Sequence, residues 1–525
     1  MGNCDISEKN HHIKKTNKLS KSKTYYKIGK SYQNSQDKIK LEFSLENCEY
    51  NSRYSIFVQD GKEVFETETV NCHYNPIIIF NTFYICNFTF ERKQILIIII
   101  KKNNNIIGTF QPALGLIVGS KNCTLVEKVN SEGPELIKIT GQGITDTNSF
   151  LYFNFFIKTN NIDFSIQQNK ISYVIISNKR KIYKSELISD YGQFKSAKIP
   201  STFLEPSFTI IFLDNYKNEI SYKNETINSF ISQNSPFGFY HVIQMDNGTI
   251  NIFNNSQLLR NFTFIDYLKN GVKLNLSIGI DFTSSNGDPT KSNSLHYISN
   301  YYKNDYEEAI RACGLIMAYY DRDQLFPVYG FGAVIKDEQP PSMCFNINFK
   351  NDPEIYTIDN VIKEYQKCLQ RIILAGPTKF YPIIRNTINT IYKQNMPLKY
   401  HVLMILTDGI ILDLQETIDV LIEGSFLPLS VIIIGVGNDH FQEMEILDGD
   451  NVPLVSSIGI KRMRDLVQFV PYNKYKNNPQ ELMAQVLEEI PRQIVEYYTM
   501  NNLYPNNLSM AKLRTQNTIN RNFKI

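Results

Sequence analysis

After Asp266 the sequence alternates short apolar segments with amphipathic ones, and this alternation limits the fold more than any other feature. The apolar segments have the length of strands, and the amphipathic segments have the apolar spacing of one helix face. Strands that are apolar on both faces and joined by helices are typical of a parallel sheet covered on both sides. The sequence therefore predicts a doubly wound α/β domain. Its predicted strands are 274–281, 328–333, 401–407, 429–436 and 466–470, and its predicted helical segments are 306–320, 358–373, 382–393, 414–423 and 481–497.

The region between residues 39 and 260 has short strand-like segments separated by turn residues. This pattern is typical of a β-sandwich, and it runs twice, which predicts all-β domains at 39–140 and 148–260. A chain of 525 residues has room for both and for an α/β domain at 262–500, followed by a flexible tail at 501–525. The predicted fold class is multidomain, with two all-β sandwiches followed by a Rossmann-like, doubly wound α/β domain.

The charge pattern disfavours nucleic acid as a partner and favours an anionic membrane. The net charge of +3 is too small for a nucleic-acid-binding chain. The tail at 1–38 carries eight lysines and no acidic residue between Lys9 and Lys30, and such runs are attracted to anionic phospholipid.

The same tail lacks the apolar core of a secretory signal, and the apolar run 94–100 is shorter than the about 20 residues that span a bilayer. The cysteines form no C-x-x-C pair, so we expect a cytoplasmic protein at the cytoplasmic face of the plasma membrane or of internal membranes.

Side chains with oxygen atoms follow two of the predicted strands of the α/β domain. Asp281 ends the first strand and is followed by the hydroxyls of Thr283 and Ser285, whereas Asp408 follows the central strand and Thr378 lies on a loop between them. The carboxyl ends of parallel strands meet at one edge of the sheet, where such proteins place their sites. An Asp after a buried strand is often only a turn residue. Two carboxylates and three hydroxyls in this order instead predict a site for Mg²⁺ or Mn²⁺.

The pattern D-x-T-x-S, then Thr, then Asp resembles the metal-ion-dependent adhesion site of von Willebrand A domains. Residues 262–500 further resemble the copine family, in segments that include 294–297, 330–333, 376–378, 406–409 and 447–450. The resemblance implies a von Willebrand A-like fold and a partner whose carboxylate completes the coordination of the metal. The ligands that it implies are Asp281, Thr283, Ser285, Thr378 and Asp408.

The same resemblance implies that the two all-β domains are C2 domains, which bind calcium through about five carboxylates from loops at one end. Lys101 and Lys102, followed by three asparagines, stand where a loop of the first domain would carry aspartates, so we expect no calcium site there. The second domain keeps Asp163, Asp214 and Glu219 as possible weak calcium ligands. Whether it binds Ca²⁺ is open.

The first four residues suggest lipid attachment. Gly2 suits N-myristoylation after removal of Met1, and Cys4 suits palmitoylation, although Ile6 stands where this signal usually has Ser. One acyl chain gives marginal membrane binding, and a second signal stabilises it.

We therefore expect a non-enzymatic adaptor that binds anionic phospholipid and recruits protein partners through the metal site, with weakened or lost calcium dependence. Two enzyme classes are the alternatives. A relative of copine-like E3 ubiquitin ligases would need RING cysteines, but no cysteine follows Cys368. A phosphotransfer enzyme with Asp281 as nucleophile would need a second Asp where Thr283 stands. Neither His296 nor His401 has a second His at ligand spacing, so neither is predicted to bind a metal or catalyse a reaction.

Overall fold

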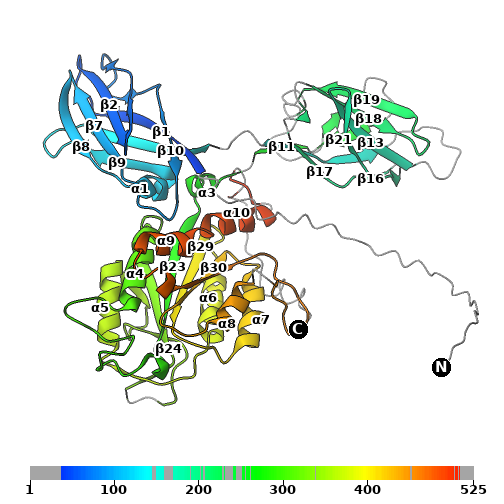
Figure 1. Ribbon diagram of the computed structural model, residues 1–525. Helices are drawn as coiled ribbons and strands as arrows, with labels where there is room; N and C mark the ends of the chain where they lie inside the picture. Colours follow the sequence, from blue (N-terminus) through cyan, green and yellow to red (C-terminus); the bar gives the residue numbers. More distant parts are fainter. Residues whose placement is uncertain are drawn as a thin grey trace, which may run out of the picture. The chain divides into compact units, whose positions relative to one another are not determined.

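The computed structural model describes residues 37–508 with internal gaps. These gaps are 145–148, 159–169, 190, 201–202, 205–206, 227–229, 231–240, 244–250, 255, 261, 337–338, 450–451, 502 and 506–507. The described residues form two β-sandwiches and an α/β domain, which confirms the predicted fold class (Figure 1). None of the helices within these ranges is long and apolar enough to cross a membrane.

The first sandwich consists of two antiparallel sheets whose strands alternate buried and exposed residues. In β1 the side chains of Ile39, Leu41, Phe43 and Leu45 are buried, because every second residue of a strand faces the opposite sheet. One sheet has the order β5-β1-β10-β9 with β6 beside β1, and the other has the order β3-β2-β7-β8 with β4 beside β2. The elements are β1 (Asp37–Glu46), β2 (Arg53–Asp60), β3 (Glu63–Glu66), β4 (Val70–Asn71), β5 (Ile78–Ile79), β6 (Tyr84–Phe88), β7 (Ile97–Lys102), β8 (Asn105–Phe110), α1 (Leu114–Gly119), β9 (Thr124–Lys128) and β10 (Leu136–Ile144).

The second sandwich has a core of its own that is rich in aromatic rings. Phe155 and Tyr173 meet edge to face with ring centroids 5.1 Å apart, as aromatic pairs in cores often do. Its strands are β11 (Ser149–Phe153), β12 (Phe155–Lys158), β13 (Lys170–Ser177), β14 (Arg180–Lys184), β15 (Ile188–Ser189), β16 (Tyr191–Gln193), β17 (Ala197–Pro200), β18 (Phe208–Leu213), β19 (Glu219–Glu225), β20 (His241–Ile243), β21 (Asn251–Asn254) and β22 (Gln257–Arg260).

The α/β domain is built on a sheet of order β26-β24-β23-β29-β30-β31, in which the five strands from β24 to β31 are parallel and β26 and β27 pair antiparallel with β24. Its strands are β23 (Lys273–Asp281), β24 (Leu325–Phe331), β25 (Ala333–Ile335), β26 (Phe345–Asn346), β27 (Glu354–Tyr356), β28 (Ile372–Leu374), β29 (Lys399–Thr407), β30 (Leu429–Gly435) and β31 (Val467–Pro471). Its helices are α3 (Phe264–Lys269), α4 (Asp305–Met317), α5 (Ile358–Cys368), α6 (Tyr381–Gln394), α7 (Leu414–Gly424), α8 (Gln442–Asp448), α9 (Pro479–Leu487) and α10 (Ile490–Met500).

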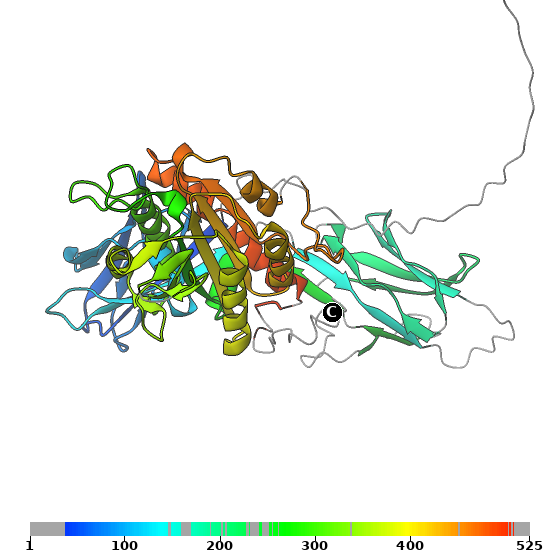
Figure 2. The same ribbon diagram turned by 90° about the horizontal axis from the view of Figure 1, so that it is seen from below.

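Helices cover both faces of this sheet (Figures 1 and 2). Met404 of β29 packs into the core formed with α4, α5, α9 and α10, whereas its neighbour Ile405 packs into the core formed with α6, α7 and α8. A strand buried on both faces explains why its sequence is apolar throughout. The predicted helical segment 358–373 is too long, because α5 ends at Cys368 and Ile372–Leu374 forms β28, which pairs with β25.

The first sandwich and the α/β domain share one buried core. The rings of Phe90, Phe264 and Tyr320 lie 4.4–6.0 Å apart, and the Tyr320 hydroxyl donates a 3.2 Å hydrogen bond to the Phe90 carbonyl. The Arg322 guanidinium donates to the carbonyls of Gly119 and Ser120 at the end of α1. These contacts hold together two parts of the chain that the second sandwich separates in sequence.

Candidate metal centre

Four of the five predicted ligands form one hydrogen-bonded chain at the carboxyl edge of the sheet. The Thr283 hydroxyl donates to Asp281 Oδ1 over 2.6 Å and lies 2.9 Å from the Ser285 hydroxyl. The Ser285 hydroxyl in turn donates to Asp408 Oδ1 over 3.0 Å. Asp281 ends β23 and Asp408 follows the adjacent parallel strand β29, so the fold brings together residues that are far apart in sequence.

The loop that carries Thr378 runs beside this chain. The Ser284 amide donates to the Ala375 carbonyl over 2.8 Å, and the Leu412 amide donates to the Thr378 carbonyl over 3.0 Å. Thr378 is itself buried. The structure thus places all five predicted residues at one edge of the sheet.

The donor set fits a small divalent cation. Asp281 is fully buried, and burial raises the pKa of its carboxyl group. Burial, and then the nearby charge of Asp281, raises the pKa of Asp408 to about 7. Two buried carboxylates that oppose each other's ionisation favour a bound cation, and carboxylate and hydroxyl oxygens are the ligands that Mg²⁺ and Mn²⁺ prefer. The set has only two acidic members, and the described residues contain no metal-binding group of three or more His, Cys, Asp or Glu.

Three residues of the site were not predicted from the sequence. Thr407 donates its hydroxyl to Asp281 Oδ2 over 2.6 Å, which occupies the second oxygen of that carboxylate. Asp439, after β30, adds a third negative charge near Asp408. His296 lies with Nε2 2.8 Å from the Asp281 carbonyl oxygen, and burial lowers its pKa to about 3. In the sequence, only the position of Asp439 after a third parallel strand could have indicated that it belongs to the site. The contacts of Thr407 and His296 with Asp281 depend on tertiary packing.

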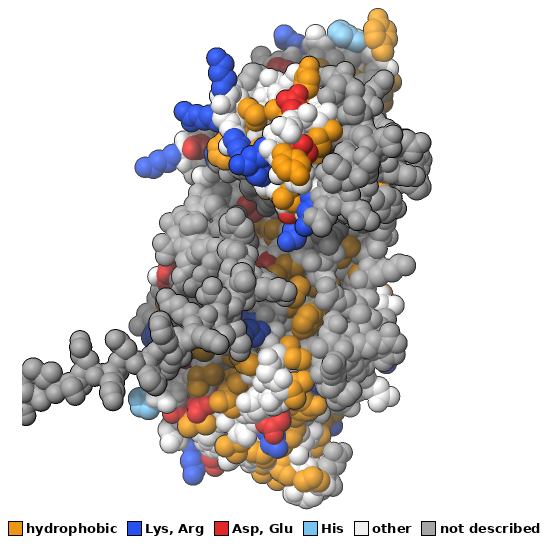
Figure 3. Space-filling view, turned by 90° about the vertical axis from the view of Figure 1, so that its right-hand side faces the viewer, with side chains coloured by type: hydrophobic (Ala, Val, Ile, Leu, Met, Phe, Trp, Pro, Cys, Tyr) orange, Lys and Arg blue, Asp and Glu red, His pale blue; other side chains and the backbone are white. Residues whose placement is uncertain are grey.

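The surface beside the site is partly apolar. Ile410 and Leu412, which closely follow Asp408, are 50% and 71% exposed. Exposed hydrophobic side chains also lie among acidic and basic ones on the side of the molecule that Figure 3 shows. Asp413, near these two residues, is buried, and its carboxylate caps α6 by accepting from the amides of Phe380 and Tyr381.

Of the other predicted ligands, Asp214 and Glu219 flank the turn between β18 and β19. Asp214 accepts from the amides of Tyr216 and Asn218, so its carboxylate closes its own turn. Glu219 begins β19 and is exposed. Asp163, Gly2 and Cys4 lie outside the described residues.

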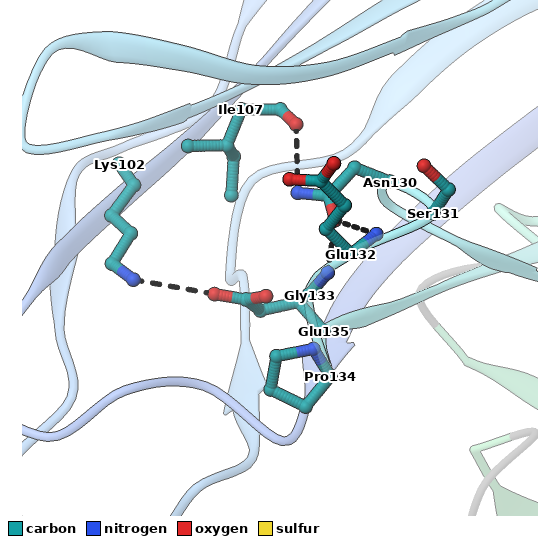
Figure 4. A pocket seen from close by; sticks show the side chains of 8 residues that line it. All are labelled: Lys102, Ile107, Asn130, Ser131, Glu132, Gly133, Pro134 and Glu135. Atoms are coloured by element: carbon teal, nitrogen blue, oxygen red, sulfur yellow. Dashed lines mark hydrogen bonds and ion pairs between the residues drawn. The ribbon is translucent and has the colours of Figure 1, made fainter.

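In the first sandwich, Lys102 occupies the end where the loops meet. Its ammonium group forms an ion pair with Glu49. It forms a second one with Glu135 at 3.3 Å, which Figure 4 shows. The Tyr54 hydroxyl lies 3.4 Å from the same Glu135 oxygen. Hydrogen bonds from Cys48 to Pro76 and from Arg53 to Asn103 join the loops around this lysine. One positive side chain therefore pairs with two carboxylates within the loop cluster and offsets part of their negative charge.

Most of the α/β domain matches a known family, since a model of the copine family, described as "Copine", matches residues 294–506. Among solved structures, the tandem C2 domains of extended-synaptotagmin 2 align at 9% identity with a TM-score of 0.18, over 48% of this chain and 99% of theirs. Proximal thread matrix protein 1 from the mussel byssus aligns at 15% identity with a TM-score of 0.25, over 41% of this chain and 47% of its own. The manganese-loaded TRAP protein of Plasmodium vivax aligns at 13% identity with a TM-score of 0.25, over 41% of this chain and 75% of its own.

Proposed function

The chain carries a copine domain at residues 294–506, and on this premise we propose that it is a membrane-associated adaptor that recruits a protein partner through a metal ion. The observation that carries the proposal is the hydrogen-bonded chain from Asp281 through Thr283 and Ser285 to Asp408. No covalent chemistry is required of these residues, so the proposed activity is binding rather than catalysis.

Mg²⁺ or Mn²⁺ would be held by Asp281, Thr283, Ser285, Thr378 and Asp408. When bound, the ion supplies a Lewis-acidic position that a carboxylate of the partner can occupy. The residues of this chain hold the ligand oxygens in place, since Thr407 fixes one carboxylate oxygen of Asp281 and Ser285 fixes one of Asp408. Ile410 and Leu412 offer apolar contact beside the ion, which favours a partner with an apolar residue next to its acidic one.

The first sandwich would contact the membrane without calcium. Tyr74 and Tyr50, in the loops around Lys102, are 97% and 54% exposed, and tyrosine rings favour the boundary between lipid and water. C2-type loops that depend on calcium carry a negative cluster that repels anionic lipid. Here the Lys102 ammonium pairs with both Glu49 and Glu135 and offsets part of their charge, so the loops have less need of a metal ion.

Calorimetric titration of the full chain with Mg²⁺ and Mn²⁺ tests the proposed metal site. We expect one ion per chain in the wild type and no binding heat in Asp281→Asn, which keeps the size of the side chain. Asp359→Asn, an exposed acidic position on α5, is the matched control and should bind as the wild type does. Equal affinity in Asp281→Asn and the wild type would refute the site.

A further inference from the structure

His296 connects the candidate metal loop to two helices. Its side chain is completely buried, with Nε2 2.8 Å from the Asp281 carbonyl oxygen and Nδ1 2.8 Å from the Tyr365 hydroxyl. Tyr365 belongs to α5, and its hydroxyl accepts a 3.2 Å hydrogen bond from the side-chain amide of Asn304, which caps α4. The ring therefore lies between a predicted ligand and the ends of two helices.

The partners determine the direction of each hydrogen bond. A carbonyl oxygen can only accept, so Nε2 of His296 carries the hydrogen and donates it to Asp281. Both partners are uncharged and the ring is buried, which favours the neutral imidazole. Nδ1 then accepts, and the Tyr365 hydroxyl is its donor. The chain Asn304 to Tyr365 to His296 to Asp281 thus has a single consistent direction.

Aromatic packing holds the ring in this orientation. Its centroid lies 4.4 Å from the ring of Tyr306 and 5.2 Å from that of Phe282. The Tyr306 hydroxyl donates to Asn286 over 2.7 Å, and the Asn286 amide donates to the Thr283 carbonyl over 3.2 Å. The backbone carbonyls of two predicted ligands, at positions 281 and 283, are therefore both fixed by buried side chains.

We propose that His296 is a positioning residue of the candidate metal site, which holds the Asp281 backbone through its Nε2 hydrogen and so orients the carboxylate toward the ion. The inference rests on the proposed function, because it concerns the same site. It assigns a role to a histidine whose sequence context gave none. Residues that orient metal ligands typically contribute 10- to 100-fold to affinity, which sets the expected scale of the effect, about tenfold or more.

The first test is calorimetric titration of the full chain with Mn²⁺. His296→Phe keeps an aromatic ring but removes both hydrogen bonds, and we expect its Kd to rise about tenfold or more. His401→Phe is the matched control, because His401 is also buried, lies in β29 of the same sheet, and pairs with Asn275 at the end remote from Asp281. Its Kd should match that of the wild type. Equal affinity in both variants and the wild type, or an equal loss in both variants, would overturn the inference.

The second test does not depend on metal binding, and its first measurement uses the wild type alone. Nitrogen-15 NMR of the histidine rings in the metal-free wild type should show His296 as the neutral Nε2–H tautomer between pH 5 and 8. Tyr365→Phe should remove the donor to Nδ1 and shift that nitrogen resonance while the Nε2–H remains. A wild type that shows this tautomer but takes up no Mn²⁺ refutes the proposed function alone. An Nδ1–H tautomer or a charged ring refutes the role of His296.

Discussion

The Ser285 hydroxyl donates a 3.0 Å hydrogen bond to Asp408 Oδ1 across 123 positions of the sequence. The bond joins the loop after β23 to the end of β29, and it satisfies one oxygen of a carboxylate whose pKa is raised by burial and by the charge of Asp281. In the metal-free site the two carboxylates therefore repel each other, and a bound cation would remove this repulsion. The carboxylate of Asp408 thus favours metal binding but destabilises the metal-free chain.

Asp408→Asn should separate these two properties. The amide keeps an oxygen that can accept from Ser285 but removes a negative charge beside Asp281, so at pH 8 the metal-free variant should melt at a higher temperature than the wild type. It should also lose the increase in Tm that Mg²⁺ produces in the wild type. Calorimetric scans in chelator and in Mg²⁺ measure both effects. A lower Tm in chelator would show that the carboxylate stabilises the metal-free fold.

Asp321 should make stability depend on pH. Its side chain is buried, accepts from the Leu276 amide over 3.2 Å, and has its pKa raised from the ordinary 3.8 to about 7, chiefly by burial. Between these values the folded state binds a proton more tightly than the unfolded state, so this group makes stability fall as pH rises from about 4 to 7. Asp321→Asn should raise the Tm at pH 8, and the gain should shrink at pH 5. A gain of equal size at both pH values would exclude this titration.

Gly119→Ala should disrupt the contact between the first sandwich and the α/β domain. A Cβ atom at this position would lie 1.8 Å from the Tyr319 carbonyl oxygen, and that oxygen belongs to backbone that cannot easily move. Overpacking of this kind costs about 1–3 kcal/mol, so we expect a lower Tm and separate unfolding steps for the two parts. Gly192→Ala is the control, since its Cβ would meet only Ile188 at 3.8 Å. One unchanged transition in Gly119→Ala would show that the interface does not contribute to stability.

The sequence was sufficient where local pattern determines structure. Period-two burial and continuous apolar strands predicted the sandwiches and the parallel sheet, and the position of Asp281 and Asp408 after such strands predicted the edge that they share. It was insufficient where a contact depends on packing between distant elements. The hydrogen bond from Thr407 to Asp281 depends on the register between β23 and β29. The ion pair between Lys102 and Glu135 depends on how two distant segments pack together. A single sequence specifies neither.

Gly2 should carry a myristoyl group, and Cys4 should carry a palmitoyl group. Two chains next to the lysine-rich segment would hold the protein on anionic lipid by burial and by charge. Mass spectrometry of the amino-terminal peptide from the native protein measures both modifications. Gly2→Ala should lose the myristoyl group and move the protein from the membrane fraction to the supernatant, whereas Cys4→Ser should keep the myristoyl group. A free or acetylated amino terminus in the wild type would rule out acylation of Gly2.

Membrane binding by the first sandwich should be insensitive to calcium, and Lys102 should be the reason. In the wild type its ammonium group already pairs with Glu49 and Glu135 and takes the place of a cation between them, so anionic vesicles should sediment the same fraction of the full chain in chelator and in calcium. Lys102→Asp would place three carboxylates in one loop cluster, which repels anionic lipid until a cation binds. This variant should bind vesicles more weakly in chelator and regain binding in calcium. Lys62→Asp makes the same change of charge in the β2–β3 turn, at the opposite end of β2, and should gain no calcium response. If calcium instead increases the sedimentation of the wild type, the ammonium group does not replace a metal ion in these loops.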